Sequence, residues 1–264
     1  MNLAAYSLAA AAFFVSIKPA PTNLFLLMCI LLVMISKQSR QNLYAILSHP
    51  VGWGSIVFFG ILCSSQLYSA GSWEQGSDYV SKYARIAYIP FLAAALLSER
   101  DVRKVLWAFV AGVVLTVGLS YLNAFVPGFC DQIGLSGCGP QNNPFIFKQH
   151  ITHGFFVALG SGLMAFLTNQ ANREGKPFWM VFALYLCSAL AALNVLLMID
   201  GRTGWLVFLV FPAVLMYRKV GVKGLLYAGL AGAAILGAMV LLVPQVQNML
   251  LDAQREYNTL LASG

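Results

Sequence analysis

The sequence predicts an all-α protein, a polytopic bundle of transmembrane helices with about nine spans. Only 9% of the 264 residues are charged and 59% are hydrophobic, whereas soluble domains carry about 25% charged residues. Long apolar runs recur along the chain, and the basic residues are unevenly divided between the connections. This composition excludes a water-soluble enzyme or binding module. The many apolar and aromatic residues also exclude a disordered chain.

The apolar runs are predicted to be helices because a spanning backbone must satisfy its own hydrogen bonds, and they lack the alternation of barrel strands. One span with its loop takes about 25–30 residues, so the length allows about nine. The predicted spans are residues 3–17, 22–36, 51–70, 79–98, 105–126, 151–168, 178–198, 204–217 and 224–243. Residues 1–243 thus form the predicted transmembrane domain. Residues 244–264 are expected to begin an outer, periplasmic loop or domain that continues beyond them.

The basic residues predict how the helices are oriented. Ten cations follow the even-numbered spans: Lys37, Arg40, Arg100, Arg103, Lys104, Arg173, Lys176, Arg218, Lys219 and Lys223. Four follow the odd-numbered spans: Lys18, Lys148, Arg202 and Arg255. The positive-inside rule then places the N-terminus and the even connections in the cytoplasm. This orientation accounts for the net charge of +7, so no nucleic-acid partner is expected.

Three groups of ionisable residues lie within spans or at their ends, where such side chains are costly and mark functional sites. They are Lys82 and Arg85; Lys148, His150 and His153; and Arg202. In the predicted topology all three groups lie at helix N-termini on the outer side. A helix N-terminus is already partly positive, so added cations there call for an anionic partner. Arginine together with free backbone N–H groups suits phosphate.

These residues also have structural interpretations. Lys82 can extend its amine to the outer surface, whereas the deeper Arg85 favours a functional role. His150 is expected to be a solvated loop residue, and His153 is either functional or a neutral histidine satisfied within the bundle. The spacing of the two histidines is a weak metal signal, and no outer loop carries two close carboxylates. We therefore expect neither a metal nor another cofactor.

Arg202 and a pair of cysteines complete the candidate residues. Arg202 can pair with Asp200, but the flanking Gly201 and Gly204 favour the close approach of a phosphate. Cys130 and Cys138 share the predicted outer loop between the fifth and sixth spans. On an oxidising face a disulfide between them is plausible, and two free thiols are the alternative.

Two segments resemble a known family. The stretch NNPFIFKQHITHGFF (142–156) is followed by a pair of hydrophobic spans and then by DGRTGWLVF (200–208). This pattern resembles the bacterial O-antigen ligase and O-antigen polymerase family, multi-span membrane glycosyltransferases of the GT-C type. The resemblance covers residues 80–264 and is specific mainly at HITHG and GRTG.

The resemblance implies a function. The enzyme would move a preassembled O-antigen polysaccharide from undecaprenyl diphosphate to the lipid A-core oligosaccharide, at the periplasmic face of the inner membrane and without a metal. Arg202 matches the arginine of the family's G-R-[ST]-G turn and would hold the diphosphate. His153 matches the family's histidine at the start of this helix. Arg85, Lys82 and Lys148 are the further predicted diphosphate-binding residues.

The chain also departs from the family. Its members have about twelve spans, and their catalytic histidine lies in a large outer loop. The resemblance therefore implies that the residue activating the acceptor lies beyond residue 264. Alternatives are an O-antigen polymerase, a protein O-oligosaccharyltransferase of the same superfamily, a noncatalytic membrane subunit, and a transporter for an anionic solute or lipid.

Overall fold

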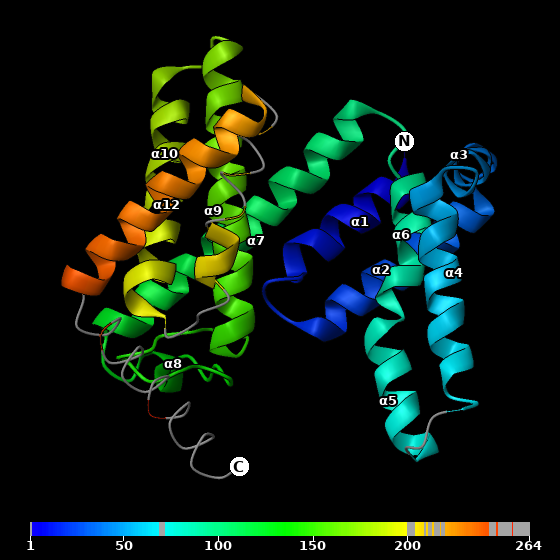
Figure 1. Ribbon diagram of the computed structural model, residues 1–264, viewed down its shortest axis with the longest axis horizontal. Helices are drawn as coiled ribbons and strands as arrows, with labels where there is room; N and C mark the ends of the chain where they lie inside the picture. The colour runs from blue at the N-terminus through cyan, green and yellow to red at the C-terminus, as the bar shows by residue number, and fades with distance from the viewer. Residues whose placement is uncertain are drawn as a thin grey trace. The chain divides into compact units, whose positions relative to one another are not determined.

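The computed structural model describes residues 2–68, 72–199, 204–208 and 220–242, and single positions between and beyond the last two ranges. These residues form helices and no strand (Figure 1), which confirms the predicted all-α class. The chain divides into two compact units, Met1–Gly112 and Val113–Gly264.

The first unit contains six helices and the beginning of a seventh. They are α1 (Leu3–Phe14), α2 (Pro19–Ile35), α3 (Lys37–Leu47), α4 (Pro50–Ser65), α5 (Trp73–Tyr83), α6 (Arg85–Ala94) and the first half of α7 (Glu99–Phe125). Asn2 caps α1, since its side chain accepts a hydrogen bond from the Ala5 N–H (3.3 Å). Pro19 and Pro21 lie in the first turn of α2, where a missing N–H costs nothing. The hydroxyl of Ser7 joins α1 to α2 by donating to the Phe25 carbonyl oxygen (2.7 Å).

Helices α1, α2, α3 and α6 share one apolar core. Its buried residues are Ala4, Leu8, Cys29, Val33, Leu43, Ala94 and Ala95. Three of these seven are alanines, whose small side chains allow neighbouring helices to approach closely, as is common in membrane bundles.

Polar contacts gather four parts of the first unit at one end. The Asn2 side-chain amide donates to the Ala95 carbonyl oxygen (2.7 Å) and to Oδ2 of Asp101 (2.9 Å). The Asn42 amide in α3 donates to the Ala94 carbonyl oxygen (3.4 Å). The start of the chain, α3, the end of α6 and the start of α7 therefore lie at the same end of this unit.

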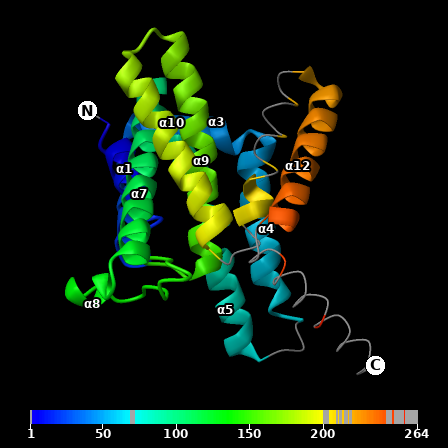
Figure 2. The same ribbon diagram turned by 90° about the vertical axis from the view of Figure 1, so that its left-hand side faces the viewer.

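The second unit contains the rest of α7, α8 (Phe129–Gln132), α9 (His150–Arg173), α10 (Phe178–Leu193), a π-helical turn (Asn194–Met198) and α12 (Val222–Leu242). Helices α9 and α10 lie side by side in both views (Figure 1, Figure 2). Ser161 and Ser188 join them reciprocally, because each hydroxyl donates to the other residue's carbonyl oxygen (2.8 and 2.9 Å). Gly175, with φ of 65°, ends α9 in the left-handed conformation that glycine adopts without strain.

Three helices within the described residues are long and apolar enough to cross a membrane: Glu99–Phe125, His150–Arg173 and Phe178–Met198. A fourth candidate is the pair α2 and α3, if these helices, which are bent by 98°, form one broken span. Helices α1 and α4 are apolar but only 12 and 16 residues long. The structure thus supports a membrane protein with several spans, whereas the count of nine and the orientation stay predictions.

The C-terminal predictions are described only in part. The predicted ninth span, 224–243, coincides with α12. Six of the fourteen residues of the predicted eighth span, 204–217, and nearly all of residues 244–264 lie outside the described residues.

Gly112 marks a close approach of α7 to α1. A Cβ atom at this position would overlap the Phe13 carbonyl oxygen and lie 3.1 Å from the Ser16 hydroxyl. Because backbone cannot easily move aside, Gly112→Ala is expected to destabilise the fold by about 1–3 kcal/mol. Gly118, on the same helix, has nothing within 4 Å of a Cβ, so Gly118→Ala is the matched control. Thermal unfolding in detergent measures both, and equal midpoints would show that this contact is absent.

Candidate functional site

The predicted span at 79–98 is not one continuous helix. Helix α5 ends at Tyr83 and α6 begins at Arg85, with Ala84 between them. Pro90 lies inside α6 and has no N–H to donate to the preceding turn. The Ala87 N–H donates to the Ala84 carbonyl oxygen (3.0 Å), an i to i+3 bond that tightens the chain at the break. The predicted span therefore contains a local change in hydrogen bonding that the apolar pattern does not report.

A cavity of about 510 Å³ lies beside the break. It is lined by Asn23, Leu27 and Ile30 of α2 and by Ser81, Ala84, Arg85 and Tyr88 of the α5–α6 segment. Its volume falls within the range of roughly 300–1,000 Å³ typical of small-molecule sites. The lining combines polar side chains with two aliphatic ones, so the cavity suits an amphiphilic ligand.

Arg85 is the cationic group of this cavity. Its side chain is exposed, and within the described residues no carboxylate forms an ion pair with it. It is the first residue of α6, and Ala84 before it offers no capping side chain. A guanidinium beside an uncapped helix start attracts an anion and can hold two phosphate oxygens at once. Arg85 also lies near the middle of the segment Trp73–Ala94.

Lys82 does not share this cavity with Arg85. Its amine lies over the Tyr79 ring, 5.2 Å from the centroid, and its side chain is exposed. The two residues are three apart and were grouped as diphosphate-binding candidates, but the cavity lining includes only Arg85. The structure therefore agrees with the interpretation of Lys82 as a surface residue.

Arg202 lies outside the described residues, but the backbone that follows it is described from Gly204. A Cβ on Gly204 would lie 2.7 Å from a Val195 methyl group and 3.0 Å from the Gly154 carbonyl oxygen. The backbone after the GRTG turn therefore packs closely on the first turns of α9. Glycine at this position is required by helix packing, whereas the sequence suggested the approach of a phosphate.

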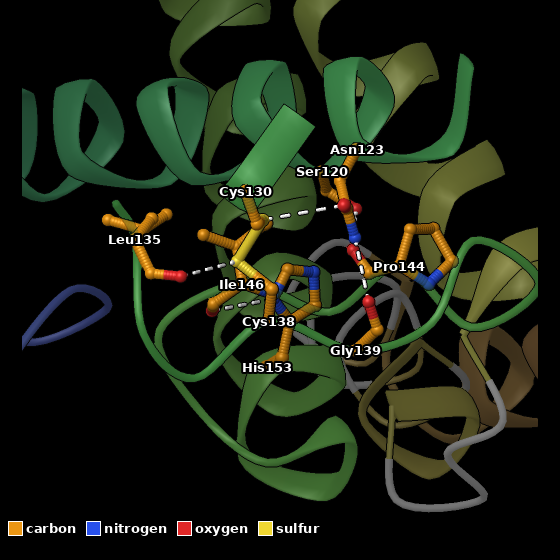
Figure 3. Close-up of a disulfide and its surroundings, with 9 residues drawn as sticks. All are labelled: Ser120, Asn123, Cys130, Leu135, Cys138, Gly139, Pro144, Ile146 and His153. Carbon is orange, nitrogen blue, oxygen red and sulfur yellow. Dashed lines mark hydrogen bonds between the residues drawn. A yellow bond between two sulfur atoms is a disulfide. The ribbon is translucent and has the colours of Figure 1, made fainter. Parts of the chain in front are cut away.

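His153 is 1% exposed, and both of its ring nitrogens have protein partners. The Ile146 N–H donates to Nδ1 (3.2 Å), and Nε2 lies 3.2 Å from Oδ1 of Asn194. The Ile146 carbonyl oxygen is slightly farther from Nδ1, at 3.3 Å. A neutral ring with its proton on Nε2 satisfies both shorter contacts. Figure 3 shows this ring beside Ile146 and the neighbouring disulfide.

Asn194 extends these contacts into a closed network. Its Nδ2 donates to the Ser120 hydroxyl oxygen (2.9 Å), and that hydroxyl donates to the Pro144 carbonyl oxygen (2.5 Å). The network starts at Ile146, ends at Pro144, and passes through α9, the π-helical turn and α7. It fixes the loop before α9 to three helical segments. This geometry favours the structural interpretation of His153, which positions the loop.

The loop between α7 and α9 is also cross-linked to itself. Cys130 and Cys138 form a disulfide (Figure 3), as the sequence favoured. The Asn123 amide of α7 donates to the Gly139 carbonyl oxygen (2.9 Å), one residue after the disulfide. Phe147 adopts a left-handed conformation with φ of 65°, uncommon for a residue with a side chain. The loop therefore has a defined path that ends at Lys148.

Lys148 and His150 lie where this loop enters α9. The Lys148 N–H donates to the Ile146 carbonyl oxygen (2.7 Å). The side chains of Lys148 and His150 are half-buried. The His150 ring lies 6.0 Å from the Phe145 ring, between centroids. His150 and His153 have different surroundings, and the described residues contain no cluster of three potential metal ligands.

No protein-family model, curated protein or solved structure matches the chain. The resemblance to the O-antigen ligase and polymerase family therefore rests on the two motif segments. The function that this resemblance implies is therefore a proposal.

The structure brings together some of the predicted residues. Lys148, His153 and the disulfide belong to the loop and helix start of the second unit, whereas Arg85 belongs to the first unit. Sequence reasoning missed Ser120 and Asn194, which connect His153 to α7. Their signal was present, because each is a polar side chain inside a predicted apolar span, where a buried polar group needs a partner.

Proposed function

We propose that the chain is the membrane domain of a metal-independent glycosyltransferase. It moves O-antigen polysaccharide from undecaprenyl diphosphate to the lipid A-core oligosaccharide, on the periplasmic face of the bacterial inner membrane. Its architecture is a GT-C-like bundle of about nine spans with a cytoplasmic N-terminus. The motif segments at 142–156 and 200–208 support the family, and the cavity at Arg85 supports the donor.

The observation that carries the proposal is the mixed lining of this cavity. Undecaprenyl diphosphate joins a doubly phosphorylated headgroup to a long apolar chain. Arg85, Ser81 and Tyr88 offer a cation and hydroxyl groups on one side of the cavity, and Leu27 and Ile30 offer apolar contact on the other. The two parts of the donor therefore have matching surroundings.

The proposed chemistry is a displacement at the sugar. The acceptor hydroxyl oxygen attacks the anomeric carbon, the bond from this carbon to the diphosphate oxygen breaks, and the electron pair leaves with the diphosphate. The acceptor's proton passes to a base. Because negative charge grows on the diphosphate, fixed arginines stabilise the transition state more than the ground state. We assign this role to Arg85, the cation of the cavity in the first unit. The resemblance assigns the same role to Arg202, and Lys148 is a further candidate cation.

The proposed orientation is supported by the contacts within the first unit. Asn2, α3 and the start of α7 lie at one end of this unit. The cations Lys37, Arg40, Arg100, Arg103 and Lys104 belong to the same segments. A concentration of basic residues at one end agrees with the positive-inside rule.

A transporter for an anionic solute or lipid is the second candidate. Transporters often bind their substrate near the middle of the membrane at broken helices, and Arg85 lies near the middle of a broken segment. The discriminating experiment offers labelled undecaprenyl diphosphate-linked glycan to the full chain in vesicles. A glycosyltransferase gives labelled acceptor and free undecaprenyl diphosphate, whereas a transporter gives unmodified donor on the other side.

The proposal is tested by the lipopolysaccharide of cells that carry the protein or its variants. Loss of a ligase is expected to leave uncapped lipid A-core with accumulated lipid-linked polymer, and Arg202→Ala should reproduce this pattern with normal amounts of membrane-inserted protein. Gel electrophoresis of lipopolysaccharide, with an immunoblot of the membranes, measures both. Caps with a single repeat would instead indicate a polymerase, and normal lipopolysaccharide with an altered glycoprotein would indicate a protein O-oligosaccharyltransferase. Wild-type caps would remove Arg202 from the mechanism.

A further inference from the structure

Helix α3 does not continue the direction of α2. The two helices are bent by 98° at Ser36, whose hydroxyl accepts a hydrogen bond from the Ser39 N–H (3.3 Å) and begins α3. The first six residues of α3, KQSRQN, are all polar and include two cations. A helix with this composition does not enter the hydrocarbon region. It fits a position along the membrane surface, from which α2 would enter the bilayer.

Packing fixes which face of α3 is turned away from the protein. Leu43 is 7% exposed and belongs to the core that α3 shares with α2 and α6. Ser39, one turn earlier, is fully buried, and Asn42 donates to the Ala94 carbonyl oxygen of α6. Helix α3 therefore cannot rotate about its own axis without breaking these contacts.

The opposite face carries Lys37, Arg40, Gln41 and Tyr44, all exposed. Lys37, Arg40 and Tyr44 are spaced by three and four residues, so they lie along one side of the helix. Tyr44 is 70% exposed, and tyrosine is typical of the level of lipid headgroups. No residue before Glu74 is acidic, and in the described part of the chain neither Lys37 nor Arg40 has an ion pair.

The neighbouring segment does not neutralise this face. Asp101 is 5% exposed, accepts from Asn2, and pairs with Lys104 (3.2 Å between Nζ and Oδ1). Arg100 is exposed beside it, and Glu99 is the other acid of this turn. The end of the unit that carries α3 therefore has an excess of positive charge.

From these observations we propose that α3 lies in the headgroup layer of the adjacent leaflet, and that Lys37 and Arg40 bind the phosphates of anionic phospholipids. In the proposed orientation this is the cytoplasmic leaflet. The occupant is bilayer lipid, because the cations lie beside the exposed Tyr44 on the outward face of a helix bent by 98° from the apolar α2, and they do not line the cavity beside α2. This binding is independent of glycosyl transfer.

The experiment measures lipid selectivity at a defined position of the full chain. A fluorophore is attached at Gln41→Cys, with Cys63 and Cys187 replaced by serine, in bilayers of phosphatidylcholine containing phosphatidylglycerol. Quenching by spin-labelled phosphatidylglycerol is compared with quenching by spin-labelled phosphatidylcholine. We expect about fivefold stronger local enrichment of the anionic lipid. In Lys37→Gln/Arg40→Gln the two spin-labelled lipids should quench about equally. In the unmutated protein the enrichment of the anionic lipid should weaken as salt is raised.

A fluorophore on the native, exposed Cys63 of α4 is the matched control. It should show no change on Lys37→Gln/Arg40→Gln, which also shows that this variant is folded. Millimolar inorganic phosphate should leave the selectivity at residue 41 unchanged, because bilayer lipid is the ligand. Equal quenching by the two lipids in the unmutated protein would overturn the proposal. So would an absence of quenching at residue 41, which would show that another macromolecule or water covers this face.

Discussion

Replacing Arg85 with alanine is expected to lower the rate of glycosyl transfer about 10²–10³-fold, the usual loss when one group that stabilises developing negative charge is removed. Arg85 is the cation of the cavity beside the α5–α6 break and pairs with no carboxylate in the described residues. Without the Arg85 guanidinium, this positive charge no longer stabilises the departing diphosphate. The measurement is the rate at which the full-length enzyme transfers labelled polysaccharide from undecaprenyl diphosphate to lipid A-core.

The matched control is Lys82→Ala, which removes a cation three residues away that does not line the cavity. This variant should transfer at a rate within a few-fold of wild type. Arg85→Lys should recover part of the activity, because lysine keeps the charge but not the two-pronged hydrogen bonding. Equal losses for Arg85→Ala and Lys82→Ala would show that general surface charge, and not this cavity, matters. An unchanged rate in Arg85→Ala would remove the cavity from the donor site.

Replacing Asn194 with leucine is expected to destabilise the second unit by about 2–4 kcal/mol, since it breaks the hydrogen bonds that Asn194 makes to two buried polar groups. These groups are the Nε2–H of His153 and the hydroxyl oxygen of Ser120. Leucine has the same number and branching of side-chain heavy atoms as asparagine and a larger volume, so a cavity does not explain the loss. Thermal or denaturant unfolding in detergent, followed by circular dichroism, measures the change.

The same substitution at Asn172, an exposed residue of α9, is the control and should be nearly neutral. A double-mutant cycle with His153→Leu tests the network itself. If Asn194 and His153 act through one hydrogen bond, the double variant should lose less stability than the sum of the two single variants. Fully additive losses would contradict the network, and a neutral Asn194→Leu would show that Asn194 is not buried beside His153.

The long helices could be predicted from the sequence because their signal is local. Uninterrupted apolar runs predicted α7, α9 and α10 close to their observed bounds, and two cysteines in one short loop favoured the observed disulfide. The same method did not reveal the change in helical hydrogen bonding at Ala84. There the apolar pattern continues while the hydrogen bonding of the helix does not.

The candidate residues show the same division. Arg85 could be singled out because a cation in an apolar segment is costly wherever the helix lies. The sequence could not show that Arg85 lines a cavity while Lys82 does not, since this depends on where α2 packs. It also left two interpretations of His153 open, and these differ only in whether partners such as Asn194 and Ile146 lie within reach.

The sequence by itself determined the helical class and indicated a membrane protein, because its apolar runs lack the alternation of barrel strands and too few charged residues are available to cover a water-soluble fold. Tertiary structure decided which polar groups are satisfied and which stay open to a ligand. His153 lies against residues 7 and 41 positions away in the chain, and both contacts favour its structural interpretation. Burial and hydrogen bonding depend on neighbours that folding brings together, and the order of residues along the chain does not specify those neighbours directly.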